Sequence, residues 1–179
     1  MTTATLSAPE ILTERLRLRR PQGADAPAIA KLANDFAVAS MTTRMPYPYG
    51  VEDARAFVSL SQALDPRQQI TFALEHRDAG FIGCLGFHRG AAAAPVELGY
   101  WLGRPYWGKG LATEATRAAL KWATQDWGRR LVASGHFADN AASANVLIKA
   151  GFLYTGEVQK RFSRARYGDA ATRMMVLIA

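Results

Sequence analysis

The sequence predicts an α+β domain with a mixed, mostly antiparallel sheet of about seven strands, flanked by about four helices. Three strand-like segments follow one another at Ile70–Glu75, Phe81–Phe87 and Val96–Leu102. Asp78-Ala79-Gly80 is a turn between the first two. The pattern then changes to a long amphipathic helix over Gly110–Trp127. Such a meander beside helices is typical of an α+β domain.

The remaining elements are predicted from periodicity and from helix and strand breakers. In chain order they are a strand at Ile11–Arg20, helices at Asp25–Asn34 and Val51–Leu64, a strand at Leu131–Phe137, a helix at Ala141–Ala150, and strands at Phe152–Gln159 and Thr172–Ile178. In the first strand, Leu16 and Leu18 alternate with arginines, which is the two-residue period of a half-buried strand. Gly151 directly follows the last helix, where a glycine cap is expected.

Three irregular segments connect these elements. Met41–Gly50 contains two prolines and two tyrosines, Arg89–Pro95 is rich in alanine, and a basic loop surrounds Tyr167-Gly168-Asp169. No repeat or linker divides the 179 residues, so one domain is expected over 1–179.

The composition favours a soluble globular protein, since 49 % of residues are hydrophobic and 21 % are charged. No apolar run approaches the ~20 residues of a membrane helix, and Met1–Thr5 lacks the features of a secretory signal. The single cysteine, Cys84, cannot form an internal disulfide, which favours a cytoplasmic location. The net charge of +7 suggests an anionic partner, either a nucleic acid or a polyphosphate cofactor, and charge alone does not choose between them.

The segment after Val96–Leu102 has the properties of a phosphate site. It runs from Gly103 to Ala112, contains Gly108-Lys109-Gly110, and leads directly into the long helix. The first N–H groups of a helix lack internal partners, and the helix dipole adds positive charge there. Two glycines allow a backbone to approach a pyrophosphate. Neither a Walker loop nor a dinucleotide fingerprint is present, and a glycine pair alone also fits an ordinary turn.

Four segments resemble the GCN5-related N-acetyltransferase (GNAT) superfamily, in its order and spacing, over about residues 11–178. They look most like the branch of ribosomal-protein alanine N-acetyltransferases (RimJ/RimL-like). The matching segments are Thr13–Arg19, Phe81–Phe87 with its Ile-Gly-x-x-Gly pattern, Glu97–Ala115, and Asp139–Phe152 with its Asn-x-x-Ser pattern.

The resemblance implies acetyl-CoA as co-substrate and splayed strands at its binding site. No metal is expected, because the three histidines do not share a metal-ligand spacing. The backbone of Leu98, Gly99 and Tyr100 would pair with the pantetheine arm. Further cofactor contacts are expected from Tyr106, Trp107, Gly108, Lys109, Gly110, Leu111, Ala112 and Asn140. Two positions depart from the family pattern. Pro105 stands where the loop motif often begins with Gln or Arg, and Leu147 stands where many members have a tyrosine acid.

Acyl transfer to an amine requires a neutral amine, a polarised carbonyl and a stabilised leaving thiolate. Glu97 is the candidate base because it is the acid on the strand beside the acetyl group, with a surface or ion-paired glutamate as the alternative. Ser143 is the candidate partner of the sulfur, with a helix-start serine as the alternative. A backbone amide near Tyr100 is expected to polarise the carbonyl.

The acceptor pocket is expected opposite the cofactor arm, with Tyr47, Tyr49, Trp101 and Phe162 as walls and Met41–Gly50 as a lid. The acceptor remains open between protein N-termini, polyamines, aminoglycosides and other small amines. So does the choice between monomer and homodimer. Two other functions stay possible, namely an acyl-CoA sensor without catalysis and a basic RNA-associated protein that uses Lys160, Arg161, Arg164 and Arg166.

Overall fold

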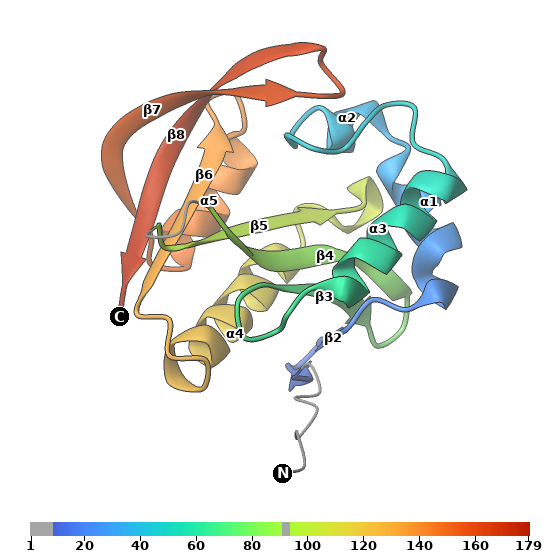
Figure 1. The fold of residues 1–179 in the computed structure, drawn as a ribbon, viewed down its shortest axis with the longest axis horizontal. Coiled ribbons are helices and arrows are strands. Elements are labelled where there is room, and N and C mark those ends of the chain that lie inside the picture. Colours follow the sequence, from blue (N-terminus) through green and yellow to red (C-terminus); the bar gives the residue numbers. More distant parts are fainter. Residues whose placement is uncertain (1–8, 91–93) are drawn as a thin grey trace.

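The computed structural model describes residues 9–90 and 94–179 and contains an open sheet that runs through the molecule (Figure 1). Within those ranges eight strands pair in the order β1-β2-β3-β4-β5-β6-β8-β7, all antiparallel except β5 with β6. The strands are β1 (Ile11–Leu12), β2 (Leu16–Arg19), β3 (Ile70–His76), β4 (Gly80–Arg89), β5 (Val96–Leu102), β6 (Leu131–Phe137), β7 (Leu153–Ser163) and β8 (Gly168–Ile178). The predicted α+β class is confirmed.

Helices cover both faces of the sheet. They are α1 (Ala26–Ala33), α2 (Phe36–Ala39), α3 (Val51–Ala63), α4 (Leu111–Gln125) and α5 (Ala141–Lys149), with 3-10 turns η1 (Gly23–Asp25) and η2 (Arg104–Tyr106). The larger core includes Ala115 and Ala119 of α4, Leu147 of α5 and Phe87 of β4. The smaller core lies on the α1 and α3 side, around Cys84. Each face of the sheet is thus buried by its own pair of helices.

Strands β5 and β6 separate partway along their length. Their parallel pairing ends at Leu98 and Ser134, although both strands continue for several residues. Ser134 Oγ donates to the Leu98 carbonyl oxygen over 2.9 Å at this last paired position. Successive residues of a strand direct their backbone N–H and C=O groups to opposite edges. Tyr100 lies two residues after Leu98, so its backbone faces the same edge, which is the gap between β5 and β6. The splayed strands expected from the family resemblance are present.

The prediction of one continuous strand at Ile11–Arg20 is wrong. Thr13 N–H donates to the Leu16 carbonyl over 2.8 Å, and Leu16 N–H donates back to Thr13 Oγ1 over 2.9 Å. This turn divides the segment into β1 and β2, which pair with each other. A side-chain hydrogen bond to nearby backbone therefore replaces the sheet ladder at this point, which period-two alternation does not reveal.

Two further segments differ from expectation. Helix α2 was not predicted, and Asp35 caps its start by accepting the Ala37 N–H over 2.9 Å. The basic loop is shorter than expected, because β7 and β8 extend to Ser163 and Gly168, which pair directly. The hairpin supplies backbone partners to charged residues that the sequence alone places in a loop. The predicted loop Arg89–Pro95 and the residues Met1–Thr5 lie partly or wholly outside the described ranges.

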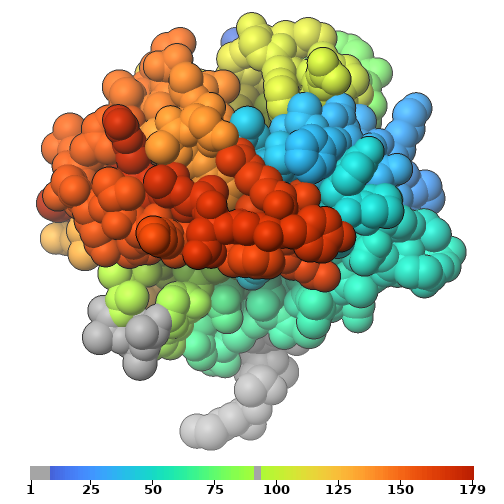
Figure 2. All heavy atoms as spheres, turned by 90° about the horizontal axis from the view of Figure 1, so that it is seen from above, coloured from blue at the N-terminus to red at the C-terminus, as the bar shows by residue number. Residues whose placement is uncertain are grey.

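The β7–β8 hairpin reaches across the molecule to the segment after α2 (Figure 1). Arg164 N–H donates to the Thr43 carbonyl over 3.0 Å, and Ser163 Oγ donates to the Thr42 carbonyl over 2.9 Å. Figure 2 shows the red hairpin lying against the blue and cyan residues of this segment. Two regions that are distant in sequence therefore form one continuous wall.

Candidate active site

A cavity of about 1200 Å³ lies where β5 and β6 separate. Its walls include the start of α4, the first turns of α5, α3, the segment 41–46, and two arginines of the β7–β8 hairpin, Arg161 and Arg164. Four β5 residues predicted for the site, Glu97, Leu98, Gly99 and Tyr100, all line it. The volume exceeds the ~300–1,000 Å³ of an ordinary ligand pocket, so it has room for two substrates.

The loop before α4 presents unpaired N–H groups to this cavity. Gly108 and Gly110 have φ values of 71° and 75°, a left-handed conformation that favours glycine. The first helical hydrogen bond joins Glu114 N–H to the Gly110 carbonyl over 3.0 Å. In the described part of the chain, the N–H groups of Leu111, Ala112 and Thr113 come before this first bond, so they have no hydrogen-bond partner within the helix. A Cβ on Gly108 would have no atom within 4 Å, so this position borders open space.

Most of the predicted loop residues line the cavity, namely Tyr106, Trp107, Gly108, Gly110, Leu111 and Ala112. Lys109 is not part of this lining, and its Nζ lies 5.8 Å from the centroid of the Tyr106 ring. Trp107 Nε1 donates to the Leu102 carbonyl over 2.8 Å, which fixes the loop to the end of β5. Pro105 lies in η2, where its restricted φ suits the turn, and Arg104 faces Asp35 at 3.9 Å.

The turn between β1 and β2 holds this loop from behind. Glu114 accepts hydrogen bonds from Thr13 Oγ1 over 2.7 Å, from Arg15 N–H over 2.9 Å and from Arg15 Nε over 2.7 Å. Arg15 Nη1 also donates to the Lys109 carbonyl over 3.0 Å. Burial opposes ionisation of Glu114, but these hydrogen bonds outweigh it and lower its pKa. Arg15 therefore connects the turn to both the loop and the first turn of α4.

The start of α5 brings Ser143 to Tyr100. Asn140 is the N-cap of α5, and its Oδ1 accepts the Ser143 N–H over 3.0 Å. The Ser143 Oγ lies 2.8 Å from the Tyr100 hydroxyl. Burial raises the pKa of Tyr100 to about 12, although its hydrogen bond with Ser143 acts in the opposite direction. Tyr100 is therefore a protonated phenol at neutral pH, and all three side chains line the cavity.

Glu97 lies in an ion pair with Arg161. The guanidinium donates to both carboxylate oxygens, with Nη2 3.0 Å from Oε2, and also bonds to Gln159. The hydrogen bond with Glu97 raises the pKa of Arg161, so Arg161 stays charged. About a third of the Glu97 side chain remains exposed, and the residue still lines the cavity. Glu97 is therefore ion-paired, as in the alternative interpretation, and it also lines the cavity, as a catalytic base must.

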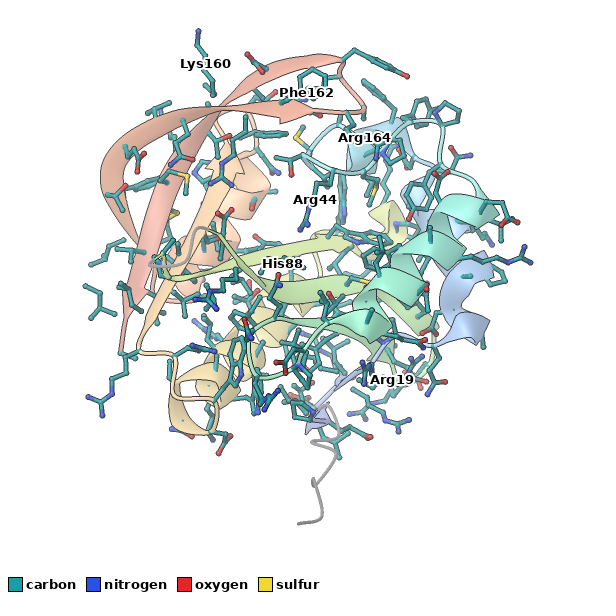
Figure 3. All side chains as sticks on the ribbon, in the orientation of Figure 1. Arg19, Arg44, His88, Lys160, Phe162 and Arg164 are labelled. Carbon is teal, nitrogen blue, oxygen red and sulfur yellow. The ribbon has the colours of Figure 1, made fainter. Side chains whose placement is uncertain are left out.

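His88 stands opposite Glu97 in the register of β4 and β5 and also lines the cavity. Its pKa is lowered to about 4, first by burial and then by the positive charge of Arg44, while Glu97 acts in the opposite direction. His88 is therefore a neutral imidazole at pH 7. Figure 3 shows Arg44 and His88 on facing sides of the space between the sheet and the hairpin.

The aromatic residues expected as acceptor walls divide into two groups. Tyr49 and Trp101 line the cavity. Tyr47 does not line it and packs against Phe36, with ring centroids 5.4 Å apart. Phe162 does not line it either, because it alternates along β7 with Arg161 and is 55 % exposed on the other face. The segment 41–46, expected as a lid, lines the cavity and is held by the hairpin.

Two other side chains that can be reactive, Cys84 and His136, also border the cavity. Cys84 is buried, which raises the pKa of its thiol. His136 bonds to Tyr154, with Nε2 2.9 Å from the hydroxyl. Among the residues that the structure describes, no cluster of His, Cys, Asp or Glu side chains could hold a metal ion. In the same part of the chain, no helix combines the length and apolar character needed to cross a membrane.

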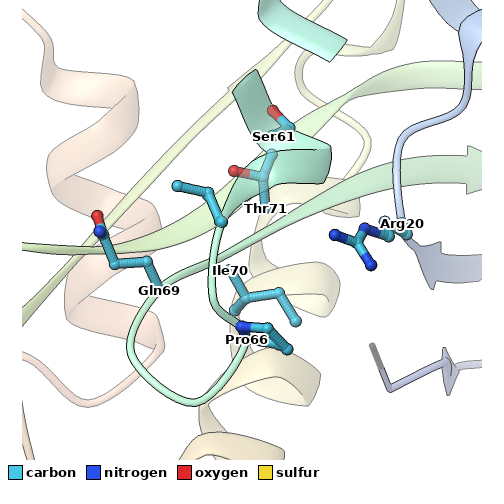
Figure 4. Close-up of a pocket in the computed structure, with 7 residues that line it drawn as sticks. Arg20, Ser61, Pro66, Gln69, Ile70 and Thr71 are labelled. Atoms are coloured by element: carbon cyan, nitrogen blue, oxygen red, sulfur yellow. The ribbon is translucent and has the colours of Figure 1, made fainter. Parts of the chain in front are cut away.

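A second hollow is much smaller. It measures about 10 Å³ and lies between the end of α3 and the start of β3, beside Arg20, Ser61 and Thr71 (Figure 4). This is about the least room that one water molecule needs, so a water molecule is the largest occupant it suits. The large cavity is therefore the candidate active site.

Three features of this site were missed from the sequence. They are the pairing of Arg161 with Glu97, the contact of the Tyr100 hydroxyl with Ser143, and the connection from Arg15 to the loop. The four basic residues 160–166 also separate, since Arg161 pairs with Glu97 and Arg166 pairs with Asp139 at 2.8 Å. Each of these contacts joins residues that are distant in sequence, so no local sequence pattern predicts it.

The comparisons identify the family. The Acetyltransferase (GNAT) domain family matches residues 15–153, which is more than half of the chain. The chain is also 30 % identical over 162 residues to the "Uncharacterized N-acetyltransferase YoaA" of Bacillus subtilis (strain 168), covering 85 % of this chain and 87 % of that relative. This chain therefore belongs to the GNAT acetyltransferases and is an acetyl-CoA-dependent acetyltransferase.

Solved structures share the fold. The Mycobacterium smegmatis RimJ, in complex with CoA-disulfide, has a TM-score of 0.82 and 21 % identity, covering 96 % of this chain and 88 % of that one. RimL, a ribosomal L7/L12 alpha-N-protein acetyltransferase in complex with coenzyme A, has a TM-score of 0.82 and 20 % identity, covering 95 % and 98 %. The fold described above is thus shared with these two solved structures.

Proposed function

We propose that this protein transfers the acetyl group of acetyl-CoA to a primary amine, by direct attack within a ternary complex. The observation that carries the proposal is the large cavity that joins the unpaired N–H groups at α4 to the gap between β5 and β6. A cofactor with a pyrophosphate and an amide-containing arm fits both features. The remainder of the cavity, toward α3 and the hairpin, is left for the amine.

The loop and the splayed strand would hold acetyl-CoA. The N–H groups from Gly108 to Ala112 would bind the pyrophosphate, and open space beside Gly108 allows its close approach. The backbone of β5 from Leu98 to Tyr100 would pair with the pantetheine arm as an added strand, with Asn140 beside it. The bound thioester supplies an activated acyl group.

Glu97 would take the proton from the attacking amine, directly or through a water molecule. Transfer forms a bond between the amine nitrogen and the acetyl carbon, breaks the carbon–sulfur bond, and leaves one proton to move from nitrogen to sulfur. An α-amine has a reference pKa of ~7.7–8.0 and needs only modest help at neutral pH. Arg161 would orient the Glu97 carboxylate. His88 is the second candidate base, because it is neutral and lies beside Glu97.

Ser143, Tyr100 and the β5 backbone would stabilise charge on the thioester. The Tyr100 N–H faces the gap and would donate to the carbonyl oxygen as it gains negative charge. The Tyr100 hydroxyl would donate to Ser143 Oγ, which leaves the Ser143 hydroxyl hydrogen free to bond the leaving sulfur. This pair would supply the hydrogen bond that other family members take from a tyrosine at the position of Leu147, which is fully buried here.

The acceptor would be a protein N-terminus or a small amine, in a monomer or a homodimer. The RimL comparison supports an N-terminal α-amine, since that protein is described as an alpha-N-protein acetyltransferase. The cytoplasm is the proposed location, because Cys84 cannot form an internal disulfide.

The test measures thiol release from acetyl-CoA with peptides of varied N-termini, polyamines and aminoglycosides. Release with one class of amine, and acetylated product by mass spectrometry, is the expected result. Tight acetyl-CoA binding with no release for any amine would instead favour an acyl-CoA sensor. Salt-dependent RNA binding without acetyl-CoA binding would favour the RNA-associated alternative.

A further inference from the structure

Two arginines on the acceptor side of the cavity lack acidic partners. Arg44 lies between α2 and α3, Arg164 lies just after β7, and both line the cavity. Within residues 9–90 and 94–179, no carboxylate comes within 4.0 Å of either guanidinium. Arg164 Nη1 reaches the Arg44 carbonyl over 3.4 Å, and Arg164 N–H fixes the segment through Thr43. The Arg164 side chain is therefore held against the backbone of Arg44, although the two residues are distant in sequence.

The acids that line the same cavity are already occupied. Glu97 pairs with Arg161, and Asp139 pairs with Arg166. Asp53 accepts the Gly50 N–H over 2.8 Å at the start of α3. Asp53 keeps its negative charge, but two guanidiniums without an ion pair to any described residue line the cavity, so positive charge is in excess there.

The position of the Arg44 guanidinium indicates that it faces the cavity. Its guanidinium lowers the pKa of His88, second only to burial, which places the charge near the floor formed by β4. Figure 3 shows Arg44 and Arg164 beneath the hairpin and Lys160 pointing out of the molecule. Arg44 and Arg164 therefore face the space where an acceptor would lie, whereas Lys160 faces solvent.

We propose that the acceptor is an amine whose own molecule carries a carboxylate or a phosphate, and that Arg44 and Arg164 bind this anionic group. Guanidinium groups present planar pairs of donors that suit both kinds of oxyanion. A polycationic acceptor would instead bring like charge to this wall, which is unfavourable. This inference rests on the proposed acetyl transfer and specifies its substrate class.

The experiment compares matched acceptors that differ in the anionic group. The pairs are a C-terminally amidated Ser-Glu peptide with a C-terminally amidated Ser-Gln peptide, glycine with glycinamide, and O-phosphoethanolamine with ethanolamine, and spermidine is the cationic acceptor. Turnover is followed by thiol release, and acceptor binding to the CoA-loaded protein is measured by calorimetry. The first two pairs test a carboxylate and the third tests a phosphate. Anionic members are expected to have KM values at least about tenfold lower than their neutral partners.

Arg44→Gln and Arg164→Gln should each remove most of that preference while leaving acetyl-CoA affinity unchanged. Lys160→Gln is the control, because it removes the same charge from the neighbouring strand outside the cavity. Turnover of neutral or cationic amines with no advantage for anionic ones overturns the inference but leaves the transferase intact. Anionic amines that bind through the arginines without turnover would contradict acetyl transfer only. Failure of every anionic member to bind would overturn the inference itself.

Discussion

The proposed cofactor side and the proposed acceptor side of the cavity are built from different parts of the chain. The proposed cofactor side consists of backbone N–H groups of one continuous segment, from the end of β5 into α4. The acceptor side uses side chains from distant segments, since Glu97 and Arg161 are 64 positions apart and Arg44 and Arg164 are 120 apart. A site made of backbone depends on chain conformation, and a site made of side chains changes with each substitution. Pro105 illustrates the first case, because it fits the loop without altering the N–H groups that follow.

The largest effect is expected where backbone conformation itself is changed. Gly108→Val places a side chain in the phosphate space and strains a residue at φ 71°. Acetyl-CoA binding should fall below detection, since loss of two charged hydrogen bonds already corresponds to about 100-fold. Calorimetry is the measurement. Gly128→Val is the matched control, because Gly128 also has φ 71° and open surroundings but lies outside the cavity. Equal losses in both variants would mean that strain alone is responsible.

Glu97→Gln tests the acceptor side, and it should lower kcat at pH 7 by about 100-fold, as expected for loss of a general base. Acetyl-CoA affinity should change by less than about twofold, because the carboxylate is outside the proposed cofactor contacts. Activity should partly recover above pH 8, where more of the amine is already neutral. Glu14→Gln, which changes an exposed acid outside the cavity, is the control. Full activity of Glu97→Gln across the pH range would remove Glu97 from the mechanism and direct attention to His88.

Tyr100→Phe separates a backbone contribution from a side-chain contribution at one residue. The proposed contact of the Tyr100 N–H with the thioester is kept, and only the hydroxyl is removed. Loss of the bond to Ser143 should lower kcat by about tenfold and leave acetyl-CoA affinity nearly unchanged. In the Ser143→Ala background the same change should have little further effect. Tyr154→Phe, which loses a hydroxyl bonded to His136, is the control. Additive losses in the double variant would separate the two residues.

The same tyrosine makes a prediction about pH. Its raised pKa of about 12 keeps the phenol protonated well above pH 10. The kcat of the unmodified protein should therefore not fall between about pH 9 and 10.5 through ionisation of a tyrosine with the ordinary pKa of ~10. A fall centred near pH 10 that disappears in Tyr100→Phe would contradict the burial assigned to this side chain.

The smallest effect is expected for Arg15→Ala, which leaves the loop backbone chemically unchanged. Arg15 only holds the loop through Lys109 and Glu114, and its side chain is 38 % exposed, so the loss is screened by solvent. Acetyl-CoA affinity should fall by about three- to fivefold in calorimetry. Arg17→Ala, on the neighbouring exposed side of β2, should leave it unchanged. A loss as large as that of Gly108→Val would show that the loop has no conformation of its own without this contact.

Several elements could be predicted from the sequence because local patterns specify them. Strand β5, the glycine loop and helix α4 each follow from adjacent residues, and the observed helix begins at Leu111 as expected within one position. The break between β1 and β2 and the cap of α2 escaped prediction because single side chains, Thr13 and Asp35, compete for the backbone there. The length of the β7–β8 hairpin escaped it because charged residues on an exposed strand resemble those of a loop.

The sequence by itself determined the α+β class and the glycine loop that opens α4, which is the proposed phosphate site, because glycine conformation and helix N-termini are local properties of the chain. Only the tertiary structure decided which charges face the acceptor. Arg161 moves from a basic loop to the side of Glu97, Arg166 pairs with Asp139, and Arg164 faces the cavity. The reason is that strand pairing and the crossing of the hairpin over the sheet assign each arginine its partner, and the contacts that hold the hairpin to residues 42–44 span more than a hundred positions of the chain.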